Sequence, residues 1–212
     1  MDTFSNFIRG QWTRSRHGAT FLDENPAKRG SDLGAFQSST VDDVREAIDA
    51  ASDAFRSWRR TSVADRQRYV SAFLTLLKDS REELARIVTL ENGKTIKESR
   101  AEVDSALVEG GYHLQQVEGF FARASEKRTS GMTTWVKIEP IGVAGIISPW
   151  NFPMNVMCRK TLPALLTGNT VVFKPATFTP WSGIFMARLF ERAGLPPGVF
   201  NCVTSGCSMG QS

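Results

Sequence analysis

Hydrophobic positions between residues 40 and 122 recur every three or four residues, the spacing that places side chains on one face of a helix. Four such segments follow one another. Each begins with a serine or threonine three residues before an acidic residue, which is an N-terminal capping signal. The four capping residues are Thr40, Ser62, Ser80 and Thr95. The pattern predicts four helices, with the third ending at Asn92-Gly93 because glycine readily terminates a helix.

The fourth predicted helix contains Gly110-Gly111 inside an apolar stripe that continues from Val103 to Phe121. Because the periodicity is unbroken, we interpret the pair as a close contact with another helix and not as a break. Ahead of the helices, residues 1–38 alternate short apolar pieces with turn formers such as Asn25-Pro26, which is typical of short strands and hairpin turns.

The pattern changes at Thr133, where apolar and polar residues alternate up to Glu139. Val136 and Ile138 share one face of this segment, whereas Trp135 and Lys137 share the other. A period of two predicts a half-exposed strand, which Pro140 ends.

Three short apolar runs follow Pro140, at residues 143–147, 171–173 and 199–203, and they begin at equal intervals of 28 residues. Such runs are typical of strands covered on both faces. Helical stretches at 154–167 and 180–193 separate them, the second with Thr179 as cap, Pro180 as first residue and Gly194 at its end. The order βαβαβ predicts an α/β fold, half of a doubly wound, Rossmann-like parallel sheet.

A fourth strand at the same spacing would begin near residue 227, and three strands would leave a sheet edge open. We therefore interpret the chain as truncated. Its expected divisions are an N-terminal part of strands and helices at 1–132, a hairpin strand at 133–140, and the βαβαβ part at 141–212.

Composition places the chain in a broad class. A hydrophobic content of 41% with 23% charged residues is ordinary for a soluble globular protein. No apolar run approaches the ~20 residues that cross a bilayer, and no signal peptide is evident, so a cytoplasmic location is expected. An odd number of cysteines without a CxxC pair argues against a disulfide scaffold or a structural zinc site; they are Cys158, Cys202 and Cys207.

Acidic and basic side chains balance over residues 1–140, whereas residues 141–212 hold the single acid Glu191 against five bases. This excess suits an anionic cofactor or substrate. A buried region with a few solvated arginines is the alternative. No basic patch interleaved with aromatic residues is present, so nucleic acid is not an expected partner.

Ligands of open α/β sheets bind beyond the carboxyl ends of the strands, which here are three loops at 148–153, 174–177 and 205–210. Pro149 and Pro153 restrict the backbone around Asn151, so its amide can be held ready for a developing oxyanion, a contact worth ~3–4 kcal/mol in a transition state. Alternatively, Asn151 caps the next helix. Lys174 can bond ribose hydroxyls or a phosphate, or remain a surface lysine.

The runs at 140–153, 163–175 and 193–201 closely resemble the aldehyde dehydrogenase superfamily, and Glu91-Asn-Gly-Lys-Thr95 and Asn25-Pro26 match it as well. The resemblance covers essentially the whole chain and is greatest to succinate-semialdehyde and 2-oxoglutarate-semialdehyde dehydrogenases. It implies a Rossmann-like cofactor domain, an oligomerisation hairpin near 133–139, and a catalytic domain that is absent from this sequence.

The same resemblance assigns residue roles. Asn151 donates its amide to the oxyanion of the thiohemiacetal, and Phe152 and Arg159 lie on the substrate side. The family's nucleophilic cysteine and general-base glutamate lie downstream of these motifs, and none of the three cysteines present is expected to replace the nucleophile. The implied cofactor-binding residues, for NADP or NAD, are Ile147, Ser148, Pro149, Trp150, Asn151, Lys174, Pro175, Ala176, Thr177, Gly206 and Gly210.

Two positions depart from the common family pattern. Thr177 stands where many relatives have a glutamate that binds the ribose 2′-hydroxyl, so a 2′-phosphate is permitted. Arg159 stands where many have an aromatic residue, and its guanidinium can clamp a substrate carboxylate. The alternative is that Arg159 points to solvent or pairs with an acid in the absent domain.

The expected function is oxidation of an aldehyde, with a carboxylate-bearing semialdehyde as one candidate, to the acid by a full-length NAD(P)-dependent parent that forms a homodimer or homotetramer. A relative that passes its thioester to coenzyme A remains open. The alternative from another class is a non-catalytic fragment that binds a dinucleotide or pairs with other subunits.

Overall fold

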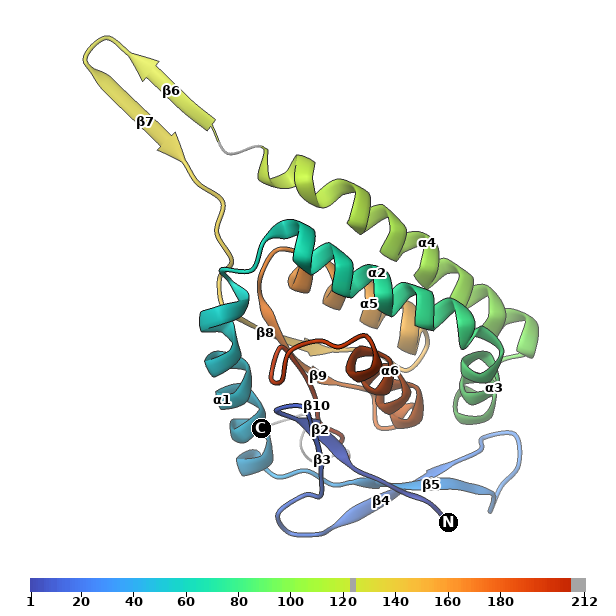
Figure 1. Cartoon of the computed structure of the whole chain (residues 1–212). Helices are drawn as coiled ribbons and strands as arrows, with labels where there is room; N and C mark the ends of the chain where they lie inside the picture. Colours follow the sequence, from blue (N-terminus) through green and yellow to red (C-terminus); the bar gives the residue numbers. More distant parts are fainter. Residues whose placement is uncertain (123–124, 207–212) are drawn as a thin grey trace.

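The computed structural model describes residues 1–122 and 125–206. At its centre is a five-stranded mixed sheet in the order β3-β2-β10-β9-β8, shown in Figure 1. Its strands are β2 (Asn6–Ile8), β3 (Gln11–Thr13), β8 (Val143–Ile147), β9 (Thr170–Lys174) and β10 (Phe200–Cys202). The three C-terminal strands run parallel, as the βαβαβ pattern predicts.

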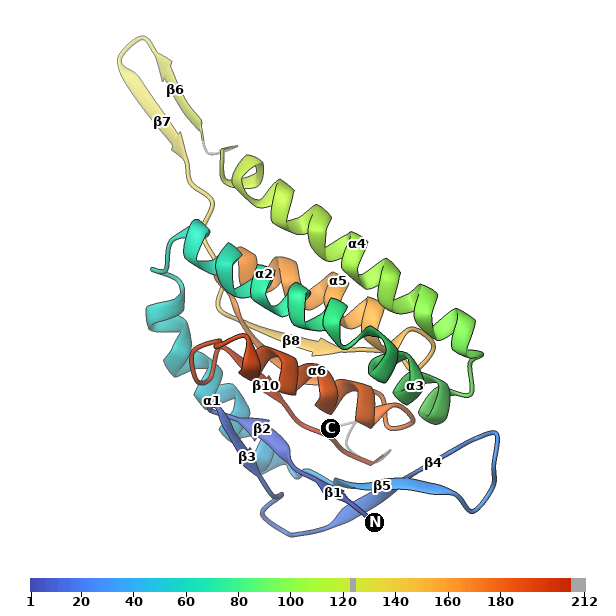
Figure 2. The ribbon, with the colours of Figure 1, turned by 45° about the vertical axis from the view of Figure 1, so that its right-hand side comes forward.

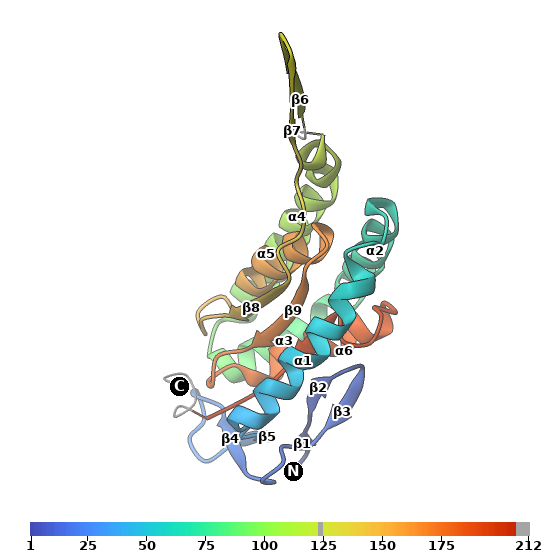
Figure 3. The ribbon, with the colours of Figure 1, turned by 90° about the vertical axis from the view of Figure 1, so that its left-hand side faces the viewer.

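Two helices connect the parallel strands on one face of the sheet, α5 (Pro153–Leu166) and α6 (Pro180–Arg192), and α1 (Val41–Trp58) covers the other face (Figure 3). The alternation of side chains along β9 explains this layering. Val171 and Phe173 belong to the main core with α5 and α6, whereas Val172 packs with Ala47 and Ala51 of α1.

A second helical layer lies over α5 and α6 (Figure 2). It consists of α2 (Val63–Asp79), α3 (Arg81–Asn92) and the long α4 (Ile96–Phe121). Phe73 of α2 stacks on Phe190 of α6 with ring centroids 4.0 Å apart. The predicted close contact at Gly110 is confirmed, because a Cβ there would come within 2.5 Å of Leu74 of α2. Gly111 has no such neighbour.

The N-terminal strands do not form hairpins alone; they join the central sheet and build a second one. β2 pairs antiparallel with β10 and so covers the sheet edge beside β10. A separate three-stranded sheet in the order β1-β5-β4 lies next to it, formed by β1 (Thr3–Phe4), β4 (Thr20–Glu24) and β5 (Asp32–Gln37).

β8 corrects one expectation. It was predicted to be covered on both faces, but it is an edge strand of which only Ile146 is buried, and Ile147 is 64% exposed. The apolar run is therefore covered mainly on the side of α5. Sequence alone could not reveal this, because a strand hidden on both faces and an edge strand can share the same composition.

The predicted strand at 133–139 is also corrected. The segment is β7 (Met132–Val136), which pairs antiparallel with β6 (Ser125–Thr129) to form a hairpin. The strand therefore ends at Val136 and not at residue 139. All five residues of β7 are exposed, so neither face packs on the sheet. Figure 1 shows the hairpin projecting away from the rest of the chain beyond the end of α4.

Three of the four predicted N-terminal cap bonds are present. Thr40 and Thr95 form complete capping boxes with Asp43 and Glu98, and the Ser62 side chain accepts from the Asp65 N–H. Ser80 directly precedes α3, as predicted, but its side chain makes no cap bond. It is also the C-terminal cap of α2, and its backbone is not extended as an N-cap usually is.

Candidate functional site

The carboxyl ends of the three parallel strands bring the predicted loops together. Ile147 at the end of β8 is directly opposite Lys174 at the end of β9, and the Ser148 N–H donates to the Lys174 carbonyl at 3.3 Å. The Thr177 hydroxyl donates to the Ser205 carbonyl at 3.0 Å, which joins the second loop to the third. The proline-bracketed turn therefore begins beside the lysine.

Two hollows adjoin these loops. A groove of about 410 Å³ lies between α1 and the sheet, and its lining includes Ile147, Lys174 and Ser205. A second cavity of about 660 Å³ is lined by Trp150 and Thr177, together with residues of β4 and the end of α3. The predicted cofactor residues are thus divided between two adjoining surfaces.

The remaining predicted residues differ in exposure. Pro149 and Asn151 are exposed, and Ala176 and Gly206 are half-buried. Ser148 is buried, and its hydroxyl has no hydrogen-bond partner among the described residues. Pro175 packs under α6, where a Cβ on Gly183 would come within 2.6 Å of it. Gly210 and Cys207 lie outside the described residues.

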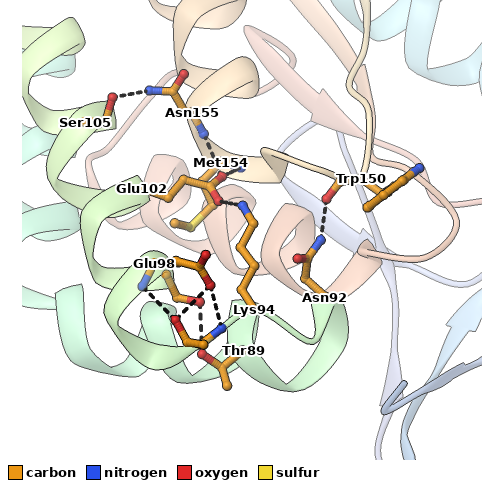
Figure 4. A network of polar contacts seen from close by, with 11 residues as sticks. Thr89, Asn92, Lys94, Glu98, Glu102, Ser105, Trp150, Met154 and Asn155 are labelled. Carbon is orange, nitrogen blue, oxygen red and sulfur yellow. Dashed lines mark hydrogen bonds and ion pairs between the residues drawn. The ribbon is translucent and has the colours of Figure 1, made fainter. Parts of the chain in front are cut away.

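Hydrogen bonds hold the chain on both sides of Asn151, and Figure 4 shows them at Trp150, Met154 and Asn155. The Asn92 side-chain amide donates to the Trp150 carbonyl at 2.7 Å. On the far side, Glu102 accepts from the N–H groups of Met154 and Asn155 at 3.0 and 3.3 Å. The residue that caps α5 is Phe152, and it makes no side-chain cap bond. The alternative role of Asn151 as a helix cap is therefore wrong.

Buried carboxylates take the place of local caps at both crossover helices. Glu102 of α4 serves α5, and Glu91 at the end of α3 accepts from Trp181 and Ser182 at the start of α6, at 2.8 and 3.0 Å. The predicted cap Thr179 makes no such bond, because Glu91 already accepts these N–H groups. Since carboxylates hold both helix N-termini, a phosphate has no free helix N-terminus at α5 or α6.

Burial, and after it the neighbouring Asp23 carboxyl, raises the pKa of Glu91 well above its ordinary value. Asp23 of β4 lines the same 660 Å³ cavity and is itself buried, which raises its pKa to about 7. Glu91 and Glu102 were not predicted as site components, because they lie far along the chain from the helix N-termini that they bond. The Glu91–Thr95 run was the available signal.

Arg159 meets an acid within this chain. Its Nε donates to Glu109 of α4 at 2.6 Å, and the arginine side chain is 59% exposed whereas that of Glu109 is 24% exposed. The structure therefore gives Arg159 an acidic partner within this chain, which the sequence analysis did not predict. Among the described residues, no hydrogen bond to the two terminal guanidinium nitrogens is found, so that end of Arg159 can still bind an anion.

The two described cysteines are unsuited to nucleophilic chemistry. Cys158 and Cys202 are buried, and this burial raises the pKa of both thiols far above the ordinary value. The nucleophile is a thiolate, which such an environment disfavours. Within residues 1–122 and 125–206, no group of three acidic, cysteine or histidine side chains could hold a metal ion, and no helix there is long and apolar enough to span a membrane.

The sequence profile of the Aldehyde dehydrogenase family matches residues 12–212. The chain is 38% identical over 204 residues to D-glyceraldehyde dehydrogenase (NADP(+)) of Thermoplasma acidophilum, covering 96% of this chain and 41% of that protein. It is 38% identical over 214 residues to alpha-ketoglutaric semialdehyde dehydrogenase of Bacillus subtilis, covering 99% and 43%.

Among solved structures, an NAD-dependent aldehyde dehydrogenase from Sinorhizobium meliloti superposes with a TM-score of 0.93 at 33% identity, covering 98% of this chain and 42% of that one. The chain therefore spans about two fifths of the length of the relatives that it matches.

Proposed function

Since the chain belongs to the aldehyde dehydrogenase family, we propose that it supplies the cofactor groove and the oxyanion donor of an NAD(P)-dependent enzyme that oxidises an aldehyde to the carboxylic acid. The observation that carries this proposal is the position of the Asn151 turn directly beside Lys174, at the carboxyl ends of parallel strands. Ligands of open α/β sheets bind at this edge.

The 410 Å³ groove supports the cofactor assignment. Its volume is within the range of small-molecule sites, and its lining is apolar apart from Lys174 and Ser205 at one end. An apolar slot with a cation at its end suits a dinucleotide, whose flat rings are followed by hydroxyls and phosphates. In this assignment Ile147 lies along the rings, and Lys174 binds the adenosine ribose or a phosphate on it.

Both NADP and NAD are proposed as cofactors. The side chain at position 177 is neutral, and its hydroxyl donates to a backbone carbonyl, so no carboxylate at this position opposes a 2′-phosphate. The bound nicotinamide supplies the hydride acceptor of the reaction.

The chain's own contribution to the chemistry is at Asn151. When a thiolate from outside this chain adds to the aldehyde carbonyl, negative charge collects on the oxygen, and the Asn151 side-chain N–H donates to it. Such a donor stabilises the transition state by ~3–4 kcal/mol if it is already in place before the charge forms. The absence of a helix-capping role leaves this amide available for that purpose.

The proposed substrate is an aldehyde that also bears a carboxylate. Arg159 has two terminal guanidinium nitrogens for a two-pronged bond to such a group, and the similarity to an alpha-ketoglutaric semialdehyde dehydrogenase supports it. Glu109 holds the arginine Nε and lowers the positive charge that the substrate meets.

Titration of the chain with NADPH and NADH, followed by fluorescence, tests the cofactor part of the proposal. Both ligands should bind, and Lys174→Ala should weaken binding by about tenfold, as expected for the loss of one charged hydrogen bond. Lys78→Ala, at an exposed position near the end of α2, is the matched control. Equal binding by all three proteins would contradict the assignment.

We propose the β6–β7 hairpin as the oligomerisation element of a homodimer or homotetramer. Met132, Trp135 and Val136 are 65%, 69% and 55% exposed on this hairpin, which is an unusual concentration of apolar side chains for a solvated strand. Light scattering that compares the molar mass of Trp135→Glu with that of the unchanged chain tests this proposal, and the variant should have the lower mass. Equal masses at equal concentration would refute it.

The second candidate is a non-catalytic module. The chain carries Asn151, but neither described cysteine is a fit nucleophile, because both thiols are buried. If the chain alone binds the dinucleotide but does not oxidise aldehydes, while a longer protein containing it does, this module is the binding half of the enzyme.

A further inference from the structure

Resting on the proposed function, we infer that Asn92, Lys94 and Glu102 form a bracket that positions the Asn151 amide for the reaction. None of the three touches the reacting atoms in this assignment. They are positioning residues that fix the backbone on both sides of Asn151.

The first contact precedes the asparagine. The Asn92 side-chain amide donates to the carbonyl of Trp150 at 2.7 Å (Figure 4). This bond belongs to no helix or sheet, so it contributes nothing to the regular structure of either partner. Its effect is to fix the peptide group that joins Trp150 to Asn151.

The second contact follows the asparagine. The Lys94 ammonium lies 4.2 Å from the centre of the Phe152 ring, a cation–π distance. The same ammonium pairs with Glu102 at 2.5 Å, and the two side chains are 16% and 1% exposed. Because this pair is almost completely out of water, its geometry tolerates little movement.

The third contact fixes the start of α5. The other oxygen of Glu102 accepts from the N–H groups of Met154 and Asn155. Asn155 is further held by its side chain, which donates to Ser105 of α4 at 2.9 Å. The helix that begins directly after the Asn151 turn is thereby attached to α4 at its first residues.

A single bend in the chain allows one short segment to reach both flanks. Gly93 ends α3 in the left-handed conformation with φ of 82°, and its Cβ would lie 3.1 Å from Pro26 if it had one. This bend lets Asn92 reach the residue before Asn151 while Lys94 reaches the residue after it. A residue with a Cβ is disfavoured in this backbone conformation.

The bracket explains how an exposed asparagine can be preorganised. A displacement of about 1 Å in a group that acts on the transition state can cost about 10²-fold in rate. Two prolines restrict the backbone angles of the turn, but they do not determine its position relative to the groove. The contacts from α3 and α4 determine that position.

A double-mutant cycle tests the inference in a full-length enzyme that carries this chain. Asn92→Ala should lower kcat about tenfold or more, with a smaller change in the Kd of NADPH, because Asn92 is not among the residues that line the groove with Lys174. In an Asn151→Ala background the same substitution should have almost no effect on kcat. Equal losses in both backgrounds would overturn the inference.

Gln67→Ala is the matched control. Gln67 makes the same kind of bond, from a side-chain amide to the Leu114 carbonyl at 3.0 Å, but between α2 and α4 away from the turn. It should leave kcat unchanged. Glu102→Gln, which keeps an acceptor for the two N–H groups, should retain more activity than Glu102→Ala.

Hydrogen exchange of the chain itself gives a readout that does not depend on catalysis. Asn92→Ala should accelerate exchange of the backbone amides of residues 150–155, whereas Gln67→Ala should not. Unchanged exchange would overturn the bracket. If Asn151→Ala leaves kcat intact but Asn92→Ala still accelerates exchange, the proposed function fails and the bracket stands as a structural feature alone.

Discussion

Thr177 is a single residue at which the choice of cofactor can be examined. Thr177 lies in the loop that joins β9 to α6. Its side chain is neutral, and its hydroxyl donates to the Ser205 carbonyl. Thr177→Glu adds a carboxylate where a 2′-phosphate is proposed to bind, and the repulsion should weaken NADPH binding about tenfold relative to NADH. Fluorescence titration of both cofactors measures the ratio.

Thr75→Glu adds the same charge to an exposed position of α2 and should leave the ratio unchanged. If Thr177→Glu weakens both cofactors equally, or neither, the proposed location of the adenosine ribose is wrong.

Glu109 determines how much of Arg159 a substrate can use. Glu109→Gln keeps a similar shape but removes the negative charge, so Arg159 should attract a substrate carboxylate more strongly. We expect kcat/KM for succinate semialdehyde to rise about two- to fivefold, the range for a partly exposed ion pair, with no change for an uncharged aldehyde of similar length. Steady-state kinetics on both substrates measures this.

Arg159→Ala should lower kcat/KM for the carboxylate-bearing substrate and leave kcat/KM for the uncharged aldehyde unchanged. An equal loss for both aldehydes would remove the carboxylate-clamp hypothesis.

Asp23 gives the fold a pH dependence. Its pKa in the folded chain is raised from 3.8 to about 7 by burial, so the folded state retains a proton that the unfolded state has released between these values. The contribution of this residue to stability is therefore complete below about pH 4 and is lost as the pH rises through 7. Asp23→Asn should raise Tm at pH 8 by about 3 °C or more relative to its effect at pH 4.

Thermal melts across this range, with Asp53→Asn as control, measure the effect; Asp53 is an exposed partner of Arg9. Parallel pH profiles for Asp23→Asn and the unchanged chain would show that Asp23 is not the buried titrating group.

At the scale of helices and strands, local signals were sufficient for elements whose partners are near in sequence. Thr40, Ser62 and Thr95 were predicted as caps and make their cap bonds, because each accepts from an N–H only three residues away. Ser80 and Thr179 are the N-cap residues at the predicted positions, but neither side chain makes a cap bond. The start of α6 depends on Glu91, which is 90 residues from Trp181 in sequence, and no local pattern contains that information.

The strands illustrate the same limit. The parallel order of β8, β9 and β10 followed from their spacing, but the exposure of β8 and the pairing of β2 with β10 depend on which segments meet in space. The sequence predicted which loops form the candidate site. The contacts that α3 and α4 make with these loops were not predicted, because contacts between residues far apart in sequence leave no periodic pattern.

Gly110 tests the packing of α4. An alanine there places a Cβ within 2.5 Å of Leu74 and 3.0 Å of Leu162, so the overpacking should cost about 1–3 kcal/mol. Gly111→Ala meets no atom within 4 Å and should stabilise the helix by about 1 kcal/mol. Urea unfolding of the two variants compares them directly, and equal free energies of unfolding would contradict the close contact.

For the molecule as a whole, the sheet and the second helical layer have distinct parts in the proposed function. The parallel strands bring the Asn151 turn and Lys174 to one edge, and α3 and α4 hold the turn through Asn92, Lys94 and Glu102. The groove between α1 and the sheet lies at the same edge. The proposed oxyanion contact and the proposed cofactor groove thus depend largely on different layers, and they should respond to different substitutions.

The most direct test of this arrangement is the kcat of Asn151→Ala in a full-length enzyme that carries the chain, measured with the Kd of NADPH in the same protein. If the main role of Asn151 is to donate to the oxyanion, its loss should lower kcat by about 10²- to 10³-fold, a much larger effect than any change in the Kd. An unaltered kcat, or a loss that is explained wholly by weaker NADPH binding, would contradict it.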